Sequence, residues 1–440
     1  MPRGSALGPR PGPQDAYARW LDACASAGWI NALVAEQVPV GGALGRVAAA
    51  QVRARWPVPR YACAAMDGIA MAAGSVAALA DAPGPGRLGP SSFAWIDTGD
   101  PIPPGLDTVV QRERVELGAD GSVLVTGPVP AGLNVRARGE DFPAGQLLIP
   151  AGRRLRPADL AVAAAAGYPV LEVVRRPVVA VIPTGDEVRP AGTVLRPGEV
   201  TDSNSLMLAA RASERGAQAR VGEVQPDRPG AIVAAVMDAA VAADLVLVIA
   251  GSSVGRRDHA ADVLTRVGGL AVHGVAVRPG HPVLLGYAVA GRERAGRERA
   301  GRERAGREQA GREQAGRPEA VVPVIGVPGY PLAAAVIFEL FAVPLIAALQ
   351  GEPSPDRAVE WAQLACDWTS SPDVEDWVPV SLTHAPGRPD GGPAVLATPS
   401  RRGAGAISRL VRADAWWPIP IGQAKFIRGE IIGVHRMPGA

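Results

Sequence analysis

Four short segments of the chain place carboxylates beside turn-forming glycines: AMDG (65–68), RGED (138–141), TGDE (184–187) and GSSVGRRD (251–258). Hard cations such as Mg²⁺ take oxygen ligands, and the backbone amides and hydroxyls of glycine-rich loops cradle anions. These are the groups that a Mg²⁺-assisted reaction on an oxyanion requires. A single Asp-Gly pair is most often only a turn, so the hypothesis rests on the joint occurrence of all four segments.

Two further loops, RPGHP (278–282) and VPGYP (327–331), share a Pro-Gly-x-Pro frame. Proline fixes φ and glycine permits positive φ, so the frame predicts a rigid turn that presents its middle side chain. His281, in the middle of the first frame, is a candidate contact for a phosphate or oxyanion. His259 is better explained as a helix-capping or surface residue. For each frame, simple termination of a strand is the alternative interpretation.

The segment 174–350 alternates buried strands with helices. The strands are predicted at 177–183, 218–224 and 244–250, and helices at 203–216 and 229–243. Such alternation predicts a central three-layer α/β domain, in which helices cover both faces of a mostly parallel sheet. Open α/β sheets bind ligands outside the carboxyl ends of their strands. The glycine-containing loops after Ile182 and Ile249 are therefore predicted to lie at the ligand-binding edge.

The rest of the chain has a different pattern. Residues 58–134 contain recurrent Pro and Gly between short apolar runs, which predicts a β-rich module, and 351–440 reads as a small β domain. Residues 290–314 are five copies of a pentapeptide, AGRER three times and AGREQ twice. A period of five matches neither helix nor strand, and alanine is its largest apolar residue. We expect 290–316 to be a disordered insertion without a catalytic role.

Charge and cysteine content narrow the class of protein. The formal net charge is +2, from 45 basic and 43 acidic residues, so no global field favours nucleic acid or an acidic membrane as partner. The three cysteines are too far apart in sequence for a zinc motif and do not form a disulfide framework, which fits a reducing cytoplasm. The longest apolar stretch, 331–349, is interrupted by Glu339 and Pro344, so we expect no membrane span.

Nine segments, taken in order, resemble the molybdopterin molybdotransferase family, which comprises MoeA and the gephyrin E domain. They are CAAMDGIAM, TGDPIPPGLDTVV, RARGEDFPAG, IPTGDEV, TDSNSLML, AGSSVGRRDH, RPGHPVLLG, VPGYPLAAAVIFELFAVPLI and GAGAISRLVRAD. The resemblance covers about 15–435. It implies an elongated, homodimeric cytoplasmic enzyme with four domains: a discontinuous linker domain (1–57 and 135–173), a β-rich domain (58–134), an α/β molybdopterin-binding domain (174–350) and a C-terminal β-barrel (351–440).

The resemblance also implies a reaction. Adenylated molybdopterin and molybdate are the substrates, Mg²⁺ assists hydrolysis of the adenylate, AMP leaves and molybdenum is placed on the dithiolene. The implied catalytic residues are Asp67, Asp141, Asp186, Glu187 and Asp258, of which Asp67, Glu187 and Asp258 are the implied metal ligands. The implied substrate-binding residues are Thr98, Gly99, Asp227, Gly251, Ser252, Ser253, Gly255, Arg278, Pro279, Gly280, His281, Pro282, Pro328, Gly329 and Pro331.

The sequence departs from the family pattern at several contact positions. His281 stands where the family has a lysine, so a permanent positive charge becomes pH-dependent. Tyr330, Ala333 and Pro379 replace an asparagine, a serine and an arginine of the family, and Ser252 alters the loop at 250–255. These departures leave two alternatives open. One is a catalytically weakened relative that binds a pterin or nucleotide as carrier, regulator or scaffold, and the other is an insertase for another oxyanion such as tungstate.

Overall fold

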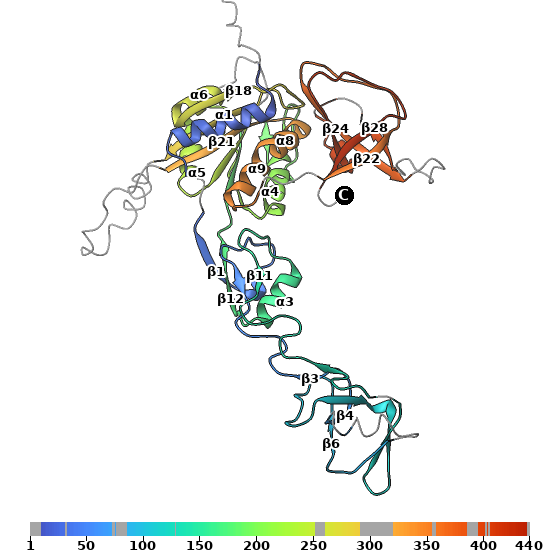
Figure 1. Ribbon diagram of the computed structural model, residues 1–440. Coiled ribbons are helices and arrows are strands. Elements are labelled where there is room, and N and C mark those ends of the chain that lie inside the picture. Colours follow the sequence, from blue (N-terminus) through green and yellow to red (C-terminus); the bar gives the residue numbers. More distant parts are fainter. Residues whose placement is uncertain are drawn as a thin grey trace, which may run out of the picture. The chain divides into compact units, whose positions relative to one another are not determined.

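The computed structural model describes residues 10–30, 33–72, 75, 86–127, 129–250, 260–290, 320–353, 358–384, 395–400, 403 and 405–437 (Figure 1). The chain divides into two compact units. One unit contains Ala35–Val174, and the other combines Met1–Val34 with Arg175–Ala440. The second unit holds the α/β domain and a C-terminal barrel, so the chain is a multidomain protein of mixed α/β and β structure, as predicted.

A six-stranded sheet forms the centre of the larger unit. Its strand order is β16 (Gln218–Val221), β13 (Val178–Pro183), β17 (Leu245–Ala250), β21 (Ala320–Pro328), β20 (Leu284–Ala290) and β18 (Gly268–His273). The first four strands are parallel, and β20 and β18 are antiparallel to their neighbours. All six residues of β13 are buried, as expected for a strand covered on both faces. The predicted mostly parallel sheet is confirmed.

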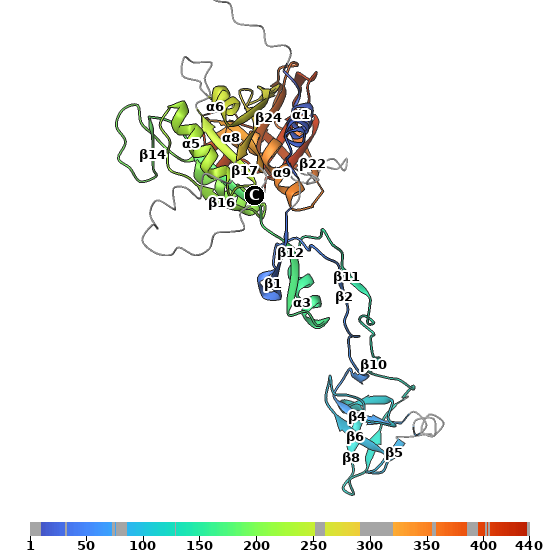
Figure 2. The ribbon, with the colours of Figure 1, turned by 90° about the vertical axis from the view of Figure 1, so that its left-hand side faces the viewer.

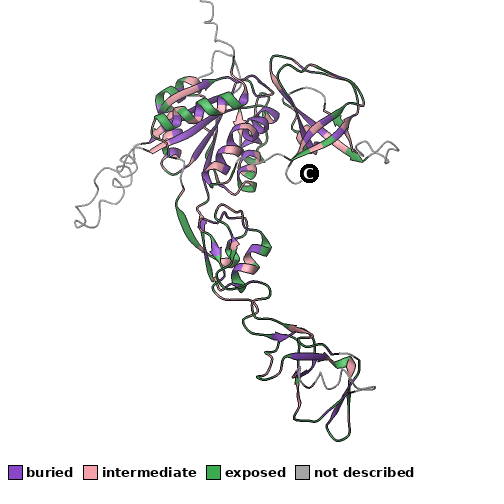
Figure 3. Cartoon of the chain, viewed as in Figure 1, coloured by how far each residue is buried: buried purple, intermediate pink, exposed green. Residues whose placement is uncertain are grey.

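Helices cover both faces of this sheet. On one face lie α1 (Pro13–Ser26), α4 (Asn204–Glu214), α8 (Pro331–Ile337) and α9 (Val343–Leu349), and on the other lie α5 (Pro229–Ala240) and α6 (Ala260–Val267) (Figure 1). Alternate residues of one strand serve the two cores: Val179 and Val181 face the first group of helices, and Ala180 faces the second. Figure 3 shows these sheet strands as buried. The predicted three-layer arrangement is therefore confirmed.

Helix α1 lies in the larger unit, whereas we predicted residues 1–57 to join 135–173. Ala16, Trp20 and Cys24 are fully buried against the sheet, and the Trp20 indole N–H donates to the Gly286 carbonyl at 2.7 Å. Their spacing of four residues places all three side chains on one helix face. The structure thus groups the first 34 residues with Arg175–Ala440, because this face is covered by the α/β core.

Helices α8 and α9 are joined by a π-helical turn at Phe338–Ala342. Pro344 follows this turn, and a proline cannot donate the backbone hydrogen bond of a regular helix. The combined segment Pro331–Leu349 is the one helix in the described part of the chain that is long and apolar enough to cross a membrane. Because 83% of it is buried inside the protein, it is explained as a core helix.

The C-terminal region closes into a five-stranded barrel, as predicted. The strand order is β24 (Glu375–His384), β25 (Val395–Pro399), β22 (Val359–Leu364), β28 (Ile431–Arg436) and β26 (Ala415–Ile419), and β26 pairs again with β24. A short strand, β19 (Val277–Arg278), adds to β24 in parallel. The first Pro-Gly-x-Pro frame therefore begins on the barrel sheet. The remaining elements of this unit are β14 (Val188–Arg189), β15 (Val200–Thr201), β23 (Trp368–Thr369), β27 (Lys425–Phe426) and α10 (Ser408–Val411).

The unit Ala35–Val174 contains several small sheets. Its paired strands are β1 (Ala35–Pro39) with β12 (Val170–Val174), β2 (Val52–Arg53) with β11 (Leu147–Ile149), and β3 (Cys63–Ala64) with β10 (Val135–Arg136) (Figure 2). Helix α3 (Pro157–Ala165) packs beside them. The predicted β-rich module is confirmed by two three-stranded sheets: β6 (Phe93–Ile96), β4 (Gly68–Met71) and β7 (Thr108–Gln111), and β5 (Gly86–Leu88), β9 (Val123–Val125) and β8 (Val115–Leu117).

Candidate active site

A cavity of about 530 Å³ lies where three parallel strands end. Pro183 of β13 is the register partner of Ile249 of β17, which in turn pairs with Val327 of β21, so the carboxyl ends of the strands are level. Thr184 caps this edge, since its hydroxyl donates to the Ile249 carbonyl at 2.8 Å. The cavity occupies the position at which open α/β sheets bind ligands. We call it the strand-end cavity.

Three predicted residues line the strand-end cavity directly: Glu187, Gly329 and Pro331. The Glu187 carboxylate is exposed, so its oxygens are available to a ligand or cation. Asp186 instead contributes to the loop itself, because it accepts a hydrogen bond from the Asp227 backbone N–H at 3.2 Å. The structure therefore brings Asp186 and Asp227 together as loop contacts. Glu187 lines the cavity together with Asp202, which also accepts a hydrogen bond from the Ser205 backbone N–H at 3.0 Å.

Asn204, at the first turn of α4, was not predicted as a site residue. Its side chain is buried, with 7% of the residue exposed, and its amide N–H donates to the Gly329 carbonyl at 2.7 Å. This bond joins the helix to the second Pro-Gly-x-Pro frame across the strand-end cavity, which both residues line. The segment TDSNSLML contained the signal, but sequence alone does not show which loop a buried amide contacts.

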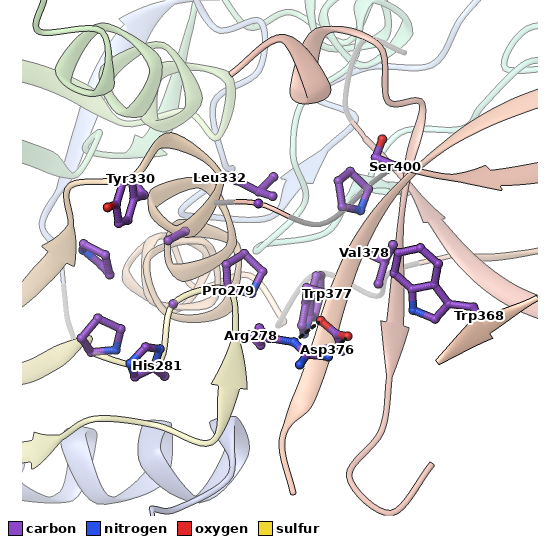
Figure 4. Close-up of a pocket in the computed structure, with 16 residues that line it drawn as sticks. Arg278, Pro279, His281, Tyr330, Leu332, Trp368, Asp376, Trp377, Val378 and Ser400 are labelled. Atoms are coloured by element: carbon purple, nitrogen blue, oxygen red, sulfur yellow. Dashed lines mark hydrogen bonds and ion pairs between the residues drawn. The ribbon is translucent and has the colours of Figure 1, made fainter. Parts of the chain in front are cut away.

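A second cavity, of about 390 Å³, lies between the α/β domain and the barrel. All five residues of the first Pro-Gly-x-Pro frame, Arg278–Pro282, line one wall of the cavity. The same wall is extended by Pro328, Tyr330, Leu332 and Ala333. The barrel supplies the opposite wall through Trp368, Asp376, Trp377, Val378, Pro379, Ser400 and Gly403. We call this space the aromatic cavity. Figure 4 shows Tyr330 and His281 on one side of it and Trp368 and Ser400 on the other.

The Arg278 guanidinium is held by the buried Asp376 carboxylate. Its Nε donates to one carboxylate oxygen at 3.2 Å, and a second guanidinium nitrogen pairs with the other oxygen (Figure 4). The Ser370 hydroxyl also donates to Asp376, at 2.9 Å. Arg278 and Asp376 are register partners in the β19–β24 pairing, which places their side chains side by side. The predicted anion-binding arginine thus already has an anionic partner.

His281 lies at the rim of the aromatic cavity. Burial against neighbouring protein atoms lowers the pKa of its imidazole below the usual value, and the positive charge of Arg10 lowers it further. The frame that carries His281 is tightly packed, since Gly280 has φ of +122° and an added Cβ would lie 2.8 Å from the Ile337 Cδ1. The rigid turn expected of the Pro-Gly-x-Pro pattern is therefore present, and it carries an imidazole whose pKa is lowered.

In the unit Ala35–Val174, the predicted residues Asp67, Thr98 and Gly99 lie together. Asp67 accepts hydrogen bonds from the hydroxyl and the backbone N–H of Thr98, each at 2.6 Å. These bonds lower the pKa of Asp67, and the nearby Arg112 charge adds to the effect. Asp141 is exposed, and its backbone N–H donates to the Val58 carbonyl at 3.0 Å. Asp67 is therefore an ionised surface carboxylate held in one orientation.

The glycine-rich loop after β17 lies outside the described residues, including the predicted site residues Gly251, Ser252, Ser253, Gly255 and Asp258. Across the described ranges, no cluster of three or more His, Cys, Asp or Glu side chains is suited to a metal ion. Asp67 and Glu187 belong to different units, and Asp258 is not described. The predicted Mg²⁺ site therefore stays a prediction.

Comparison with known proteins adds independent information to this geometry. Family models match three consecutive regions: the MoeA N-terminal region (domain I and II) at residues 13–167, a probable molybdopterin binding domain at 180–348, and the MoeA C-terminal region (domain IV) at 361–436. Molybdopterin molybdenumtransferase 2 of Mycobacterium tuberculosis (strain H37Rv) is 31% identical over 373 residues, which make up 80% of this chain and 84% of the relative. The chain belongs to the molybdopterin molybdenumtransferase family.

Other members of the molybdopterin molybdenumtransferase family match to different extents. The Nostoc enzyme is 33% identical over 264 residues, or 56% of this chain, and the matched part spans only 60% of that relative. A crystal structure of a MoeA protein of molybdopterin biosynthesis from Pyrococcus is 27% identical, with a TM-score of 0.75 over 98% of this chain and 99% of that one. Membership thus rests on sequence and on fold along nearly the whole chain.

Proposed function

We propose that this protein is a molybdopterin molybdenumtransferase of molybdenum cofactor biosynthesis. It takes adenylated molybdopterin and molybdate as substrates, releases AMP in a Mg²⁺-dependent step and transfers molybdenum to the pterin dithiolene. The observation that carries the proposal is the strand-end cavity, which combines an exposed carboxylate, a buried amide and the first turn of a helix at one edge of the sheet. Family membership supplies the class of substrate.

The residues of the strand-end cavity have distinct roles in this proposal. The first turn of α4 borders the cavity, and a helix N-terminus favours a phosphate through its backbone N–H groups. One of these groups, the Ser205 N–H, already donates to the Asp202 carboxylate at 3.0 Å. Asn204 fixes the Gly329 carbonyl, so the frame at 327–331 keeps its shape when the substrate binds. Asp186, through the Asp227 backbone, holds the loop that carries Glu187. Substrate orientation then comes from rigid loops.

Asp67, Glu187 and Asp258 are the proposed Mg²⁺ ligands, with Asp141 as a further catalytic carboxylate. Asp67 and Glu187 belong to different units, so each is proposed as a ligand without being placed at one ion. The donor set fits this cation, because Mg²⁺ prefers oxygen ligands and usually binds through one or two carboxylates together with substrate phosphates. When bound, Mg²⁺ would neutralise charge on the phosphoanhydride. Ser252, Ser253 and the amides of Gly251 and Gly255 are proposed to hold oxyanions beside Asp258, and Thr98 and Gly99 to support Asp67.

The decisive experiment is to incubate the purified protein with adenylated molybdopterin, Mg²⁺ and either molybdate or tungstate, and to measure AMP release and metal uptake. We expect both products with molybdate, and none when Mg²⁺ is removed by a chelator. Asp258→Asn should abolish AMP release while the protein stays folded. Unchanged release in this variant would remove Asp258 from the site, and uptake of tungstate alone would identify an insertase for that oxyanion.

A second candidate function follows from one observation, the ion pair between Arg278 and Asp376. Because this arginine is already neutralised, the chain could bind the pterin or a nucleotide as carrier, regulator or scaffold without inserting metal. Tight binding of adenylated molybdopterin without AMP release or metal uptake would support this role. For either function we propose a cytoplasmic homodimer acting on a small pterin substrate and an oxyanion, without nucleic acid or membrane as partner.

A further inference from the structure

The aromatic cavity is walled mainly by flat and apolar side chains. Tyr330, Trp368 and Trp377 contribute three aromatic rings, and the other apolar lining residues are Pro279, Pro282, Pro328, Leu332, Ala333, Val378 and Pro379. Its volume of about 390 Å³ is within the range of roughly 300–1,000 Å³ typical of small-molecule sites. Such sites combine apolar and aromatic walls with a few placed polar groups, which are here His281 and Ser400.

The charges of the aromatic cavity cancel. Arg278 and Asp376 are its permanently charged lining residues, and they are joined by the two-point ion pair described above. A dianion that leaves water needs a surplus of positive charge and hydrogen bonds to replace its hydration. The Arg278 charge is already paired with the carboxylate of Asp376, a residue that is only 4% exposed. The cavity therefore disfavours molybdate, although the sequence of its 278–282 wall predicts contact with an oxyanion.

Four positions at which the sequence departs from the family pattern line this cavity: His281, Tyr330, Ala333 and Pro379. Ser252, a further departure, lies outside the described residues. The four positions come from three loops or strands that are far apart in the chain. Three of the four residues are apolar or aromatic, in keeping with the other walls. The departures therefore describe one altered ligand environment.

We propose that the aromatic cavity binds an uncharged, planar nitrogen heterocycle and is not the oxyanion seat. Aromatic rings and prolines offer flat surfaces on which such a ring stacks, and His281 and Ser400 offer hydrogen bonds at its edge. Two parts of the proposed substrate share this chemistry, the pterin and the adenine. The inference rests on the proposed function only where it names the pterin and the adenine as the two possible rings. The composition and charge of the cavity walls do not depend on the proposed function.

Tyr330 connects the proposed heterocycle site to the proposed site of the reaction. This residue lines both the aromatic cavity and the strand-end cavity, and its ring also lies 3.6 Å from a Cβ placed on Gly405. A substrate with its ring in the aromatic cavity can therefore extend its phosphate past Tyr330 to the first turn of α4. In this arrangement Tyr330 is a specificity-determining residue between the ring and the phosphate.

The first test measures binding to the full chain by isothermal titration calorimetry with three probes: neopterin, adenosine and sodium molybdate. We expect one of the two uncharged rings to bind, and its identity names the source of the heterocycle. Tyr330→Ala should weaken that binding about tenfold, the loss of one stacking contact, whereas Tyr330→Phe should retain it. Tyr330 is 54% exposed, so these variants should fold. Trp361→Ala, at a 61% exposed aromatic residue of the barrel outside the cavity, is the matched control.

The second test changes the charge of the cavity. Asp376→Asn keeps the side-chain shape but removes the anionic partner of Arg278, so molybdate binding should appear or strengthen at least tenfold. If the unaltered protein binds any molybdate, the single change Arg278→Gln should leave that binding unchanged. The inference is overturned if neither ring binds, if Tyr330→Ala binds the ring as well as the unaltered protein does, or if Arg278→Gln abolishes molybdate binding. AMP release is measured separately, so absent release with ring binding intact would sink the proposed function and leave the inference standing.

Discussion

Asp67 and Thr98 form a two-point contact, in which the hydroxyl and the backbone N–H of one threonine both donate to the same carboxylate oxygen at 2.6 Å. Hydrogen bonds to the charged form of a carboxylate lower its pKa. Asp67 is surface-exposed, so its orientation comes from this contact. A carboxylate that is ionised and fixed before a ligand arrives is well suited to contact a cation.

Removing the hydroxyl should change the titration of Asp67. Thr98→Val keeps the backbone bond but loses the side-chain bond, which is the largest cause of the lowered pKa, so the pKa should rise toward its ordinary value. A folded-state pKa below the unfolded value contributes stability above the unfolded pKa, and this is lost as pH falls through the folded pKa. The variant should therefore lose less stability on acidification. Carboxyl ¹³C NMR titration measures the pKa. Thr98→Ser is the control, and an equal shift in both variants would contradict the assignment.

Asn204 should position the strand-end cavity. Asn204→Asp replaces the N–H donor with an oxygen that repels the Gly329 carbonyl, so we expect AMP release to fall about tenfold to hundredfold, as for a misplaced reacting group. The loss should appear in kcat. Because a buried carboxylate facing a carbonyl oxygen also destabilises the fold, the rate is measured well below the thermal midpoint of the variant. Ser213→Ala, on the same helix but bonded to the Ala209 carbonyl, should leave the rate unchanged. Equal rates for Asn204→Asp and the unaltered protein would exclude this positioning role.

Glu339 should be a stability determinant of the α/β core. Its carboxylate is 4% exposed and pairs with Arg211 and with Arg215, the latter at 3.6 Å. Glu339→Leu leaves two partly buried guanidinium groups without this partner, at a cost of about 3 kcal/mol in the free energy of unfolding. Urea denaturation followed by circular dichroism measures the loss.

A matched control is available on the same arginine. Glu214 is half exposed and lies 3.8 Å from Arg211, so Glu214→Gln should cost less than about 0.5 kcal/mol. The double change Arg211→Met with Glu339→Leu should recover part of the loss, since an apolar pair can replace a buried ion pair. If Glu339→Leu is no more costly than Glu214→Gln, the buried pair is not a stability determinant.

The segment 291–319 should be dispensable. It joins β20 to β21, and Ala290 and Ala320 on either side of it are direct register partners. Replacing it with Asn-Gly should close the hairpin with a tight turn and stabilise the protein by about 2 kcal/mol through lower loop-closure entropy. AMP release should not change. If activity falls strongly, a second variant carries a scrambled segment of equal length. Restored activity in that variant would show that only the length of the segment matters. Activity that is not restored would refute the expectation that the segment has no catalytic role.

The sequence predicted the parts of the fold that follow from local periodicity. Runs such as 178–183 and 244–250 are continuously apolar because both faces of the sheet are covered, and this pattern needs no knowledge of the rest of the chain. What α1 packs against could not be predicted from its spacing. Its apolar spacing shows that Trp20 is buried, but a spacing cannot show that its partner is Gly286, 266 residues away.

The sequence predicted those site residues that lie in glycine- or proline-containing loops and are of a type suited to binding a cation or an anion. Glu187, Gly329 and the frame at 278–282 all line cavities. Asp376 and Trp368 were missed because they reach the aromatic cavity only through barrel closure and the β19–β24 pairing. The neutralisation of Arg278 was missed for the same reason, since its partner is 98 residues away in sequence. Contacts set by strand register between distant segments are outside the reach of motif spacing.

The pairing of Ala290 with Ala320 also bears on how this gene can change. Short tandem repeats gain and lose units readily when DNA is copied, and most positions in an enzyme would not survive such events. Here Ala290 and Ala320, on either side of the segment 291–319, are paired in one hairpin, so whole pentapeptides can be added or removed while every strand keeps its neighbours. The same position offers a place to insert an affinity tag or fluorescent reporter without disturbing the sheet.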